Sequence, residues 1–212
     1  MSALPLELLP RDRAPEMLFI LLHGYGDRPE GLLGLAGQLR EAFPEAAVII
    51  PPGFAESVWP DGREWYSLEG LTRENERERL AAVLPLLEAL VKELQDRFGL
   101  TNPDTALVGF SQGAVMALEL GQFHDGLVGR VVAFAGRYVA IPDHAPELTT
   151  LHLLHGEADD VMPVAHSEAA FDRLTLLHGD ATLDTASGVG HELHPALVEV
   201  AIGRLRGTIP MR

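Results

Sequence analysis

The chain has 212 residues, of which 47% are hydrophobic and none is cysteine, and its formal net charge at pH 7 is −15. The lack of thiols excludes disulfide bridges, thiolate metal sites and a cysteine nucleophile. The chain has 31 acidic and 16 basic residues, and its net negative charge repels phosphate backbones and anionic lipid headgroups. We therefore expect neither nucleic-acid binding nor stable membrane association.

A chain of this length can bury one sizeable hydrophobic core, and we predict a single domain over residues 1–212. Residues 1–7 contain neither the basic segment nor the unbroken apolar segment of a secretory signal peptide. No apolar run approaches the roughly 18 residues that a membrane-spanning helix needs. We therefore expect a soluble protein with a cytoplasmic location.

Continuous apolar runs predict strands that are covered on both faces, as in a parallel sheet. The first two runs, 17–22 and 46–50, flank a predicted helix over 32–43, which makes a β-α-β unit. The repetition of such units predicts an α/β fold with a mostly parallel, doubly wound sheet, helices on both faces and no large lid. Further strands are predicted at 105–108, 131–136, 151–156 and, with a weaker alternating pattern, 181–185.

The longest predicted helix is amphipathic, with apolar residues at the i, i+3, i+4, i+7 spacing of one helix face. Thr72 is its expected N-cap, and Pro85 is expected to kink or divide it. Two more helices are predicted over 164–177 and from Pro195 to about residue 205. The apolar stripe of the long helix consists of Leu80, Val83, Leu84, Leu87, Val91 and Leu94.

Residues 53–71 show no regular pattern, although they contain both tryptophans of the chain. An irregular segment of this length is uncommon unless it serves a site. Trp65 and Tyr66 are therefore predicted to contact substrate in an acyl pocket, to which the flexible thioether of Met162 is also suited. The alternative is that the aromatic side chains, Trp59 included, only pack the segment onto the core.

The residues Gly109-Phe110-Ser111-Gln112-Gly113 lie between a predicted strand and a predicted helix. A strand, the pattern G-x-S-x-G and a helix form the nucleophile elbow of the α/β-hydrolases. The sharp turn lifts the Ser111 hydroxyl above the end of the strand in a strained backbone conformation, and it leaves no room for a Cβ at Gly109 or Gly113. If the pentapeptide is considered alone, the alternative is a glycine-containing loop between strand and helix that merely happens to contain a serine.

A serine hydroxyl needs a neighbouring base, usually a histidine that a carboxylate orients. In α/β-hydrolases these groups follow the order Ser, Asp or Glu, His, each after a strand. Ser111, then Asp159 or Asp160, then His191 meet both conditions. The sequence therefore predicts a catalytic triad.

Acyl transfer also requires hydrogen-bond donors for the oxyanion of the tetrahedral intermediate. The backbone N–H of Gln112 is one predicted donor, because it follows the nucleophile at the start of a helix. The second is expected from the loop after the first strand, and we predict the N–H of Tyr25. His23 is expected to shape that loop through hydrogen bonds.

Several of these segments together resemble the phospholipase/carboxylesterase family of α/β-hydrolases, which includes the acyl-protein thioesterases. The resemblance spans roughly residues 15–205, and two segments are similar to its small bacterial esterase branch in particular. The family segments are Leu22–Asp27, Gly109–Ala114, His155–Asp159 with Pro163, and Gly190–His191, and the branch segments are Trp65–Ser67 and Leu71–Asn75.

The resemblance implies a serine carboxylesterase that hydrolyses small to medium acyl esters, with thioesters and lysophospholipids as further candidates. It also implies Asp159 as the triad carboxylate, because the family's aspartate is the third residue after His-Gly. A proline often follows that aspartate, whereas this chain has Asp160, so Asp160 stays an alternative. An amidase or peptidase and a non-catalytic binding protein on the same fold are the alternative functions.

No metal or cofactor is expected. His191-Glu192-Leu193-His194 is one residue shorter than the zinc-binding motif H-E-x-x-H. The expected partner is a small-molecule ester substrate. The oligomeric state is open, with a homodimer as one alternative.

Overall fold

The structure is a computed structural model that describes residues 4–208. The ends of the predicted 1–212 domain, and with them residues 1–3 of the N-terminal stretch, lie outside the described residues. The main strands are β1 (Leu6–Leu8), β2 (Met17–Leu22), β3 (Ala46–Ile50), β6 (Thr105–Phe110), β7 (Arg130–Phe134), β8 (Thr150–Gly156) and β9 (Ala181–Ala186). The helices are α1 (Leu33–Ala42), α2 (Arg73–Phe98), α3 (Gln112–Phe123), α4 (Ala165–Leu176) and α5 (Pro195–Thr208).

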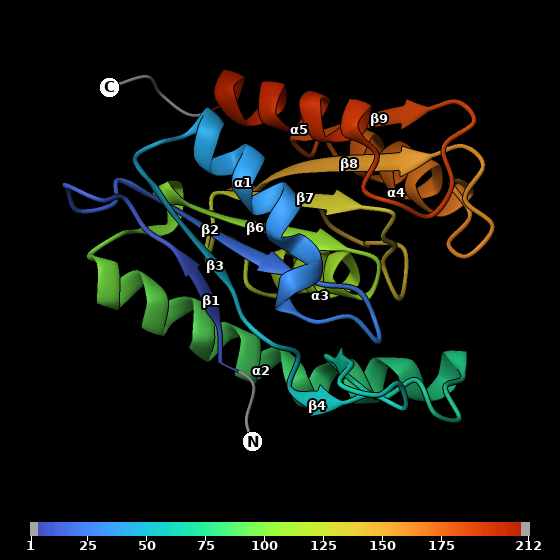
Figure 1. Ribbon diagram of the computed structural model, residues 1–212. Coiled ribbons are helices and arrows are strands. Elements are labelled where there is room, and N and C mark those ends of the chain that lie inside the picture. The colour runs from blue at the N-terminus through green and yellow to red at the C-terminus, as the bar shows by residue number, and fades with distance from the viewer. Residues whose placement is uncertain (1–3, 209–212) are drawn as a thin grey trace.

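The strands form one seven-stranded sheet in the order β1-β3-β2-β6-β7-β8-β9 (Figure 1). Within this sheet only β1 runs antiparallel to its neighbour β3, and the other pairs of neighbouring strands are parallel. The predicted α/β fold with a mostly parallel sheet is therefore confirmed. The carboxyl ends of the parallel strands meet at one edge, where ligands bind in such sheets.

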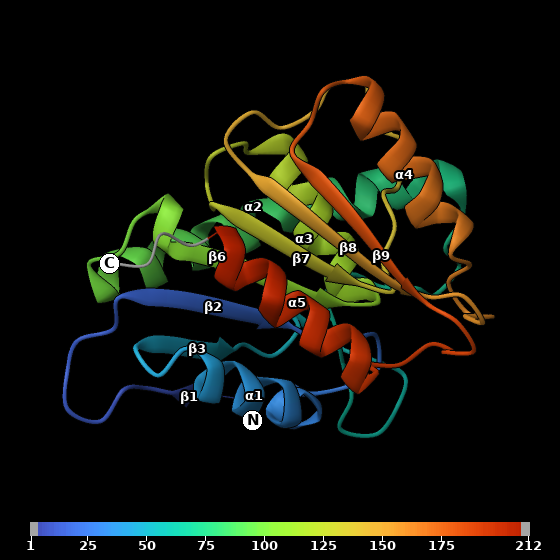
Figure 2. The ribbon, with the colours of Figure 1, turned by 90° about the horizontal axis from the view of Figure 1, so that it is seen from above.

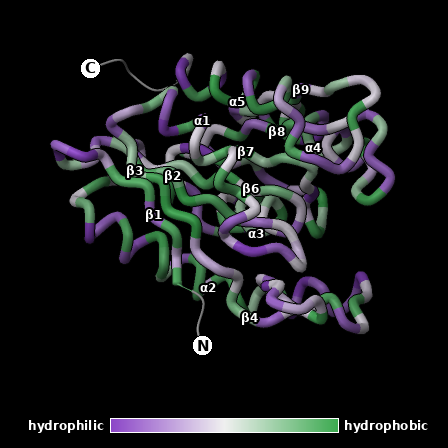
Figure 3. Tube along the Cα trace, viewed as in Figure 1, coloured by the Kyte–Doolittle hydropathy of each residue, from purple (hydrophilic) through white to green (hydrophobic). Residues whose placement is uncertain are grey.

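Helices cover both faces of this sheet (Figures 1 and 2). On one face α2, α3 and α4 pack in one cluster of buried apolar side chains, and on the other face α1 and α5 pack in a second cluster. All six residues of β2 and all five of β3 are buried, which explains their unbroken apolar runs. Figure 3 shows hydrophobic residues concentrated along these strands.

The long helix α2 begins with the predicted cap. The Thr72 hydroxyl accepts from the Asn75 N–H, while the Asn75 side chain accepts from the Thr72 N–H. The helix ends at Gly99, which adopts the left-handed conformation with φ of 67°. It continues through Pro85, so the predicted division is wrong. Pro85 and Ala81 lie on the exposed face, where water can bond the carbonyl that Pro85 leaves without a donor.

Two short elements differ from the sequence-based description. Strand β1 was not predicted, because three residues are too few to show a pattern. Residues 53–71 are not fully irregular, since β4 (Ala55–Glu56) and β5 (Arg63–Glu64) pair antiparallel within them. Over residues 4–208, no helix combines the length and the apolar character needed to cross a membrane.

Candidate active site

Ser111 lies between β6 and α3 with φ of 55° and ψ of −118°, a conformation that a residue with a side chain adopts only under strain. Glycine is required on both sides of it. A Cβ on Gly109 would collide with the backbone at the start of α3, and a Cβ on Gly113 would collide with the carbonyl of Leu22 at the end of β2. The close approach thus involves two neighbouring strands, and it fixes the Ser111 hydroxyl above the sheet edge.

Asp159 lies in the turn that follows β8, and its side chain is fully buried. One carboxylate oxygen, Oδ1, accepts hydrogen bonds from the N–H groups of Val161 at 2.9 Å and Met162 at 2.7 Å. Burial acts to raise the pKa of Asp159, but the hydrogen bonds from Met162, His191 and Val161 outweigh it and hold the pKa below its ordinary value. The carboxylate is therefore ionised at neutral pH.

The loop that carries His191 is bonded to the start of the Asp159 turn. The N–H of Glu157 donates to Ala186, and the N–H of Ala158 donates to Val189. Gly156 is required here, because a Cβ on it would collide with the carbonyl oxygen of Val189. These contacts bring the loops after β8 and β9 together, and the His191 ring lies beside Phe110 with centroids 5.0 Å apart.

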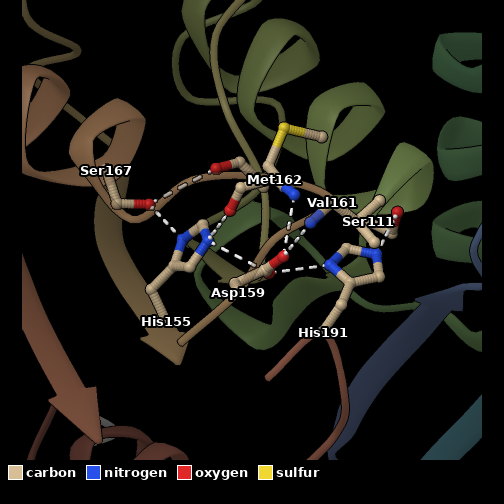
Figure 4. Close-up of polar contacts among 8 residues, drawn as sticks. Ser111, His155, Asp159, Val161, Met162, Ser167 and His191 are labelled. Atoms are coloured by element: carbon tan, nitrogen blue, oxygen red, sulfur yellow. Dashed lines mark hydrogen bonds and ion pairs between the residues drawn. The ribbon is translucent and has the colours of Figure 1, made fainter. Parts of the chain in front are cut away.

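The three side chains of the predicted triad form one hydrogen-bonded chain (Figure 4). His191 Nε2 lies 2.9 Å from Ser111 Oγ, and His191 Nδ1 lies 2.7 Å from Asp159 Oδ2. An ionised carboxylate can only accept, so Nδ1 carries the proton and Nε2 is free to accept one from Ser111. Asp160 is exposed and takes no part in this chain of contacts.

The loop after β2 lies directly beside the nucleophile. A Cβ built on Gly24 would be 3.4 Å from the Ser111 Cβ. Buried His23 shapes this loop as predicted: its Nδ1 lies 2.7 Å from the carbonyl oxygen of Gly24, and its Nε2 accepts from the Gly53 N–H. Burial lowers the pKa of His23, which favours this neutral form. Tyr25, one of the two predicted oxyanion donors, follows in the same loop.

A sequence model of the phospholipase/carboxylesterase family matches residues 7–209. The chain belongs to this family. Esterase YpfH of Escherichia coli (strain K12) is 39% identical over 199 residues, which cover 94% of this chain and 86% of that protein. The crystal structure of esterase PE8 matches with a TM-score of 0.89 at 32% identity and covers 98% of this chain and 100% of that chain.

A more distant relative is acyl-protein thioesterase 1 of Yarrowia lipolytica (strain CLIB 122 / E 150), which is 29% identical over 191 residues. The match covers 81% of this chain and 82% of that protein. The family resemblance and the α/β-hydrolase fold are thus confirmed, and as a member of the phospholipase/carboxylesterase family the chain is an enzyme of the carboxylesterase class.

In this family member, the side chain of Gln112 has a role that the sequence analysis did not foresee. Its Oε1 accepts from the Trp65 N–H at 3.0 Å, and its Nε2 donates to the carbonyl oxygen of Tyr66 at 2.7 Å. The Trp65 indole N–H donates to the carbonyl oxygen of His23 at 2.8 Å. The residue after the nucleophile therefore ties the aromatic residues to the elbow.

The predicted substrate contacts differ in their exposure. Trp65 has 0% of its surface exposed and Tyr66 has 4%, which favours the alternative that they pack the segment onto the core. The Tyr66 hydroxyl donates to Glu76 inside the protein. Met162 is half-buried and stays a candidate for the pocket wall. Direct contact of Trp65 and Tyr66 with substrate stays a prediction.

The sequence analysis also missed a buried group behind the triad. His155 at the end of β8 has 0% exposure and contacts the Asp159 turn. A histidine at the end of a largely apolar strand, four residues before the predicted catalytic aspartate, was the signal available in the sequence. Among residues 4–208, no three His, Cys, Asp or Glu side chains are grouped so that they could hold a metal ion.

Proposed function

We propose that the chain is a serine carboxylesterase that acts through Ser111, His191 and Asp159 and forms a covalent acyl-enzyme. The observation that carries the proposal is the hydrogen-bonded chain from Ser111 Oγ through the His191 ring to the buried carboxylate of Asp159. A strained, half-exposed serine next to a neutral imidazole nitrogen is the arrangement that nucleophilic acyl transfer requires.

In the first half-reaction, Ser111 Oγ attacks the carbonyl carbon of the ester while its proton passes to His191 Nε2. The negative charge that develops on the carbonyl oxygen is stabilised by the N–H groups of Gln112 and Tyr25. The N–H of Gln112 is suited to this role, because the first turn of α3 provides no acceptor for it. The bond to the alcohol then breaks, and the alcohol leaves with the proton from His191.

In the second half-reaction, a water molecule attacks the acyl-enzyme. His191 accepts the proton of the water as the new carbon–oxygen bond forms. The tetrahedral intermediate then collapses, the carboxylic acid leaves, and Ser111 recovers its proton from His191. Asp159 stays ionised throughout and stabilises the imidazolium that forms in each half-reaction.

We further propose small to medium acyl esters as the substrates, with acyl thioesters as a second group. The thioester suggestion is supported by the relative named acyl-protein thioesterase 1. The lysophospholipid suggestion is supported only by the name of the family. A rate profile over p-nitrophenyl esters of increasing chain length, with an acyl thioester and a matched amide beside them, would rank these classes and test the amidase alternative.

The direct test of the proposal is titration of the wild-type protein with a fluorophosphonate. We expect stoichiometric, irreversible labelling at Ser111, identified by peptide mass spectrometry, and loss of esterase activity in proportion to labelling. A protein that hydrolyses esters without being labelled at Ser111 would contradict the assignment of the nucleophile. A protein that neither reacts nor hydrolyses would support the binding-protein alternative.

A further inference from the structure

The buried histidine behind the triad, His155, has a defined set of contacts. It is the last side chain of β8 on the face that carries Leu151 and Leu153, and it points toward α4. There its Nδ1 lies 2.7 Å from the Ser167 hydroxyl. Its Nε2 lies 2.6 Å from the carbonyl oxygen of Met162, and Figure 4 marks this contact with a dashed line. Both ring nitrogens therefore have partners in the protein.

The Nε2 atom of His155 also lies 3.3 Å from Asp159 Oδ2, the carboxylate oxygen that faces His191. A carbonyl oxygen and a carboxylate can only accept, so Nε2 must carry the proton. Nδ1 is then an acceptor, and the Ser167 hydroxyl donates its single proton to this nitrogen at 2.7 Å rather than to the carbonyl oxygen of Gly136, which lies 3.3 Å away. Burial lowers the pKa of His155, so the ring is neutral and directs a polar N–H, rather than a full positive charge, at the carboxylate.

The backbone of Met162 completes this arrangement. Its N–H donates to Asp159 Oδ1, and its carbonyl oxygen accepts from His155. His155 thus holds the turn that binds one carboxylate oxygen, and its N–H lies against the other oxygen. With His191 on the same Oδ2, the carboxylate is contacted on both of its oxygens and has little freedom to rotate.

We propose that His155 is a positioning residue, which fixes the Asp159 carboxylate in the orientation that His191 needs, while Ser167 fixes the tautomer of the His155 ring. The inference rests on the proposed function, because it assigns His155 a role only through Asp159 and His191. A misplacement of about 1 Å in a catalytic group can cost on the order of 10²-fold in rate. Loss of the His155 N–H is therefore expected to lower kcat while KM changes little.

The same strand provides a matched control. His152 is also a buried histidine of β8, with 1% of its surface exposed, but it lies on the opposite face of the sheet. Its Nδ1 contacts Thr182 at 2.9 Å, and it has no contact with the Asp159 turn. His152→Leu and His155→Leu therefore remove the same group from the same strand, and only the second removes a contact to the proposed triad.

The experiment compares His155→Leu, His155→Gln, Ser167→Ala and His152→Leu with the wild type. Rates are divided by the active-site concentration from fluorophosphonate titration, so that unfolded protein does not count. We expect His155→Leu to lower kcat by about 10- to 100-fold with KM within about three-fold. His155→Gln, whose amide N–H can replace the Nε2–H, should recover most of the loss. Ser167→Ala should lower kcat by a few-fold, and His152→Leu should change only the melting temperature.

A spectroscopic measurement separates positioning from packing. The proton between His191 Nδ1 and Asp159 Oδ2 should give a proton NMR signal downfield of the amide region. We expect this signal in the wild type, His155→Gln and His152→Leu, and we expect it to be broadened or absent in His155→Leu. Equal losses of kcat in His155→Leu and His152→Leu, or an unchanged kcat and signal in His155→Leu, would overturn the proposal.

Ser167→Ala keeps the test decisive if His155→Leu does not fold, because it removes a single hydroxyl. In that case, a normal kcat and an unchanged downfield signal in both Ser167→Ala and His155→Gln would overturn the proposal. A kcat lowered by a few-fold in Ser167→Ala, with a kcat near that of the wild type in His155→Gln, would support it. The proposed function itself is tested on the wild type. A wild type that is unlabelled at Ser111 refutes that function before any His155 variant is compared.

Discussion

Two groups of segments meet at the site, and the structure holds them in different ways. The triad loops, which follow β6, β8 and β9, are fixed by backbone hydrogen bonds and by glycines without room for a Cβ. The aromatic segment, residues 53–71, also has backbone hydrogen bonds, which join Arg63 to Gly26 and Asp27, but several of its other anchors are side chains. Gln112 binds its backbone at Trp65, Arg63 donates to Gly53, and Arg79 donates to Ser67 and Glu69.

This difference separates the chemistry from the selection of substrate. A side-chain anchor can be replaced without moving the backbone of the triad loops, whereas a backbone hydrogen bond changes only when the fold changes. We therefore expect substitutions in the triad loops to change the rate for every ester. Substitutions in or near the aromatic segment should instead change stability or the preference among acyl chains, and the following predictions test this division.

The largest effect is expected at the nucleophile. Ser111→Ala removes the atom that bonds to the acyl group, and the loss in kcat should be on the order of 10⁶ by analogy with other serine hydrolases. His191→Ala should cost about as much. Both variants should keep the wild-type circular dichroism spectrum, and steady-state hydrolysis of a p-nitrophenyl ester measures the loss. A Ser111→Ala protein with appreciable burst-phase turnover would mean that another residue is acylated.

The next effect concerns the orienting carboxylate. Asp159→Ala should lower kcat by about 10⁴-fold, because His191 then loses both its tautomer and its orientation. Asp160→Ala is the matched control, since Asp160 is the neighbouring residue with an exposed side chain. We expect it to stay within about two-fold of the wild type. The assignment is wrong if Asp160→Ala is the more damaging of the two in the same assay.

Within the aromatic segment, Trp65→Ala is expected to act on stability. The fully buried indole is lost together with its hydrogen bond to His23, at a cost of about 3–5 kcal/mol in the free energy of unfolding. The melting temperature should fall by on the order of 10 °C, as differential scanning calorimetry can measure. A change in chain-length preference at an unchanged melting temperature would instead show that Trp65 contacts the acyl chain.

A pH effect is expected from the polar groups that anchor the aromatic segment. Tyr66 and Arg137 both bind Glu76. Glu119 lies near this group and is buried. Its burial and the negative charge of Glu76 raise the pKa of Glu119 to about 7. Because this value lies above the ordinary 4.5, the folded protein holds the proton over a range in which the unfolded chain has released it. The contribution of Glu119 to the free energy of unfolding therefore falls as the pH rises from 4.5 to about 7, and it stays constant at higher pH.

Glu119→Gln removes this titration, since the amide stays neutral at every pH. The variant and the wild type should have similar stability near pH 5, and the variant should be more stable at pH 8, by on the order of 3 kcal/mol. Urea unfolding of both proteins at several pH values measures the difference. Two parallel stability profiles would show that Glu119 is already charged at pH 5, which would contradict the expected protonation of this buried group.

The sequence predicted the triad loops well and the aromatic segment poorly, for a physical reason. Ser111, Asp159 and His191 each follow a strand of five or more residues, so a pattern of hydrophobicity fixes where each lies. The aromatic segment contains strands of only two residues, β4 and β5, which are too short for any pattern. Its structure depends on contacts with residues far along the chain, such as Gln112, and no local signal contains those contacts.

The same reason explains the errors in single elements. Pro85 predicted a kink or a division of α2 from local chemistry, and the division is absent because the exposed position of Pro85 makes its missing hydrogen bond tolerable. His155 was named only as the first residue of a family segment, because its partners Met162 and Ser167 come from the next turn and the next helix. Patterns within one element were predicted directly, whereas contacts between elements were predicted only where a motif indicated them, as for the triad.

The smallest effect is expected at Met162, where the two groups of segments meet. Its backbone belongs to the triad loop that binds Asp159, while its half-buried side chain packs against the same core cluster as Trp65 and Tyr66. Met162→Ala leaves the backbone hydrogen bonds in place and removes only the apolar side chain, so the rate for an acetate ester should hardly change. Each acyl methylene that loses contact costs up to about 0.8 kcal/mol, or roughly four-fold in kcat/KM.

Esters of medium chain length should therefore lose several-fold in kcat/KM relative to acetate in Met162→Ala. Met162→Leu, which keeps most of the apolar volume, serves as the control and should retain the wild-type profile. The measurement is kcat/KM for p-nitrophenyl esters from acetate to octanoate on all three proteins. A uniform loss at every chain length would show that the side chain supports the Asp159 turn and forms no part of the pocket, and the division between chemistry and selection would then not hold at this residue.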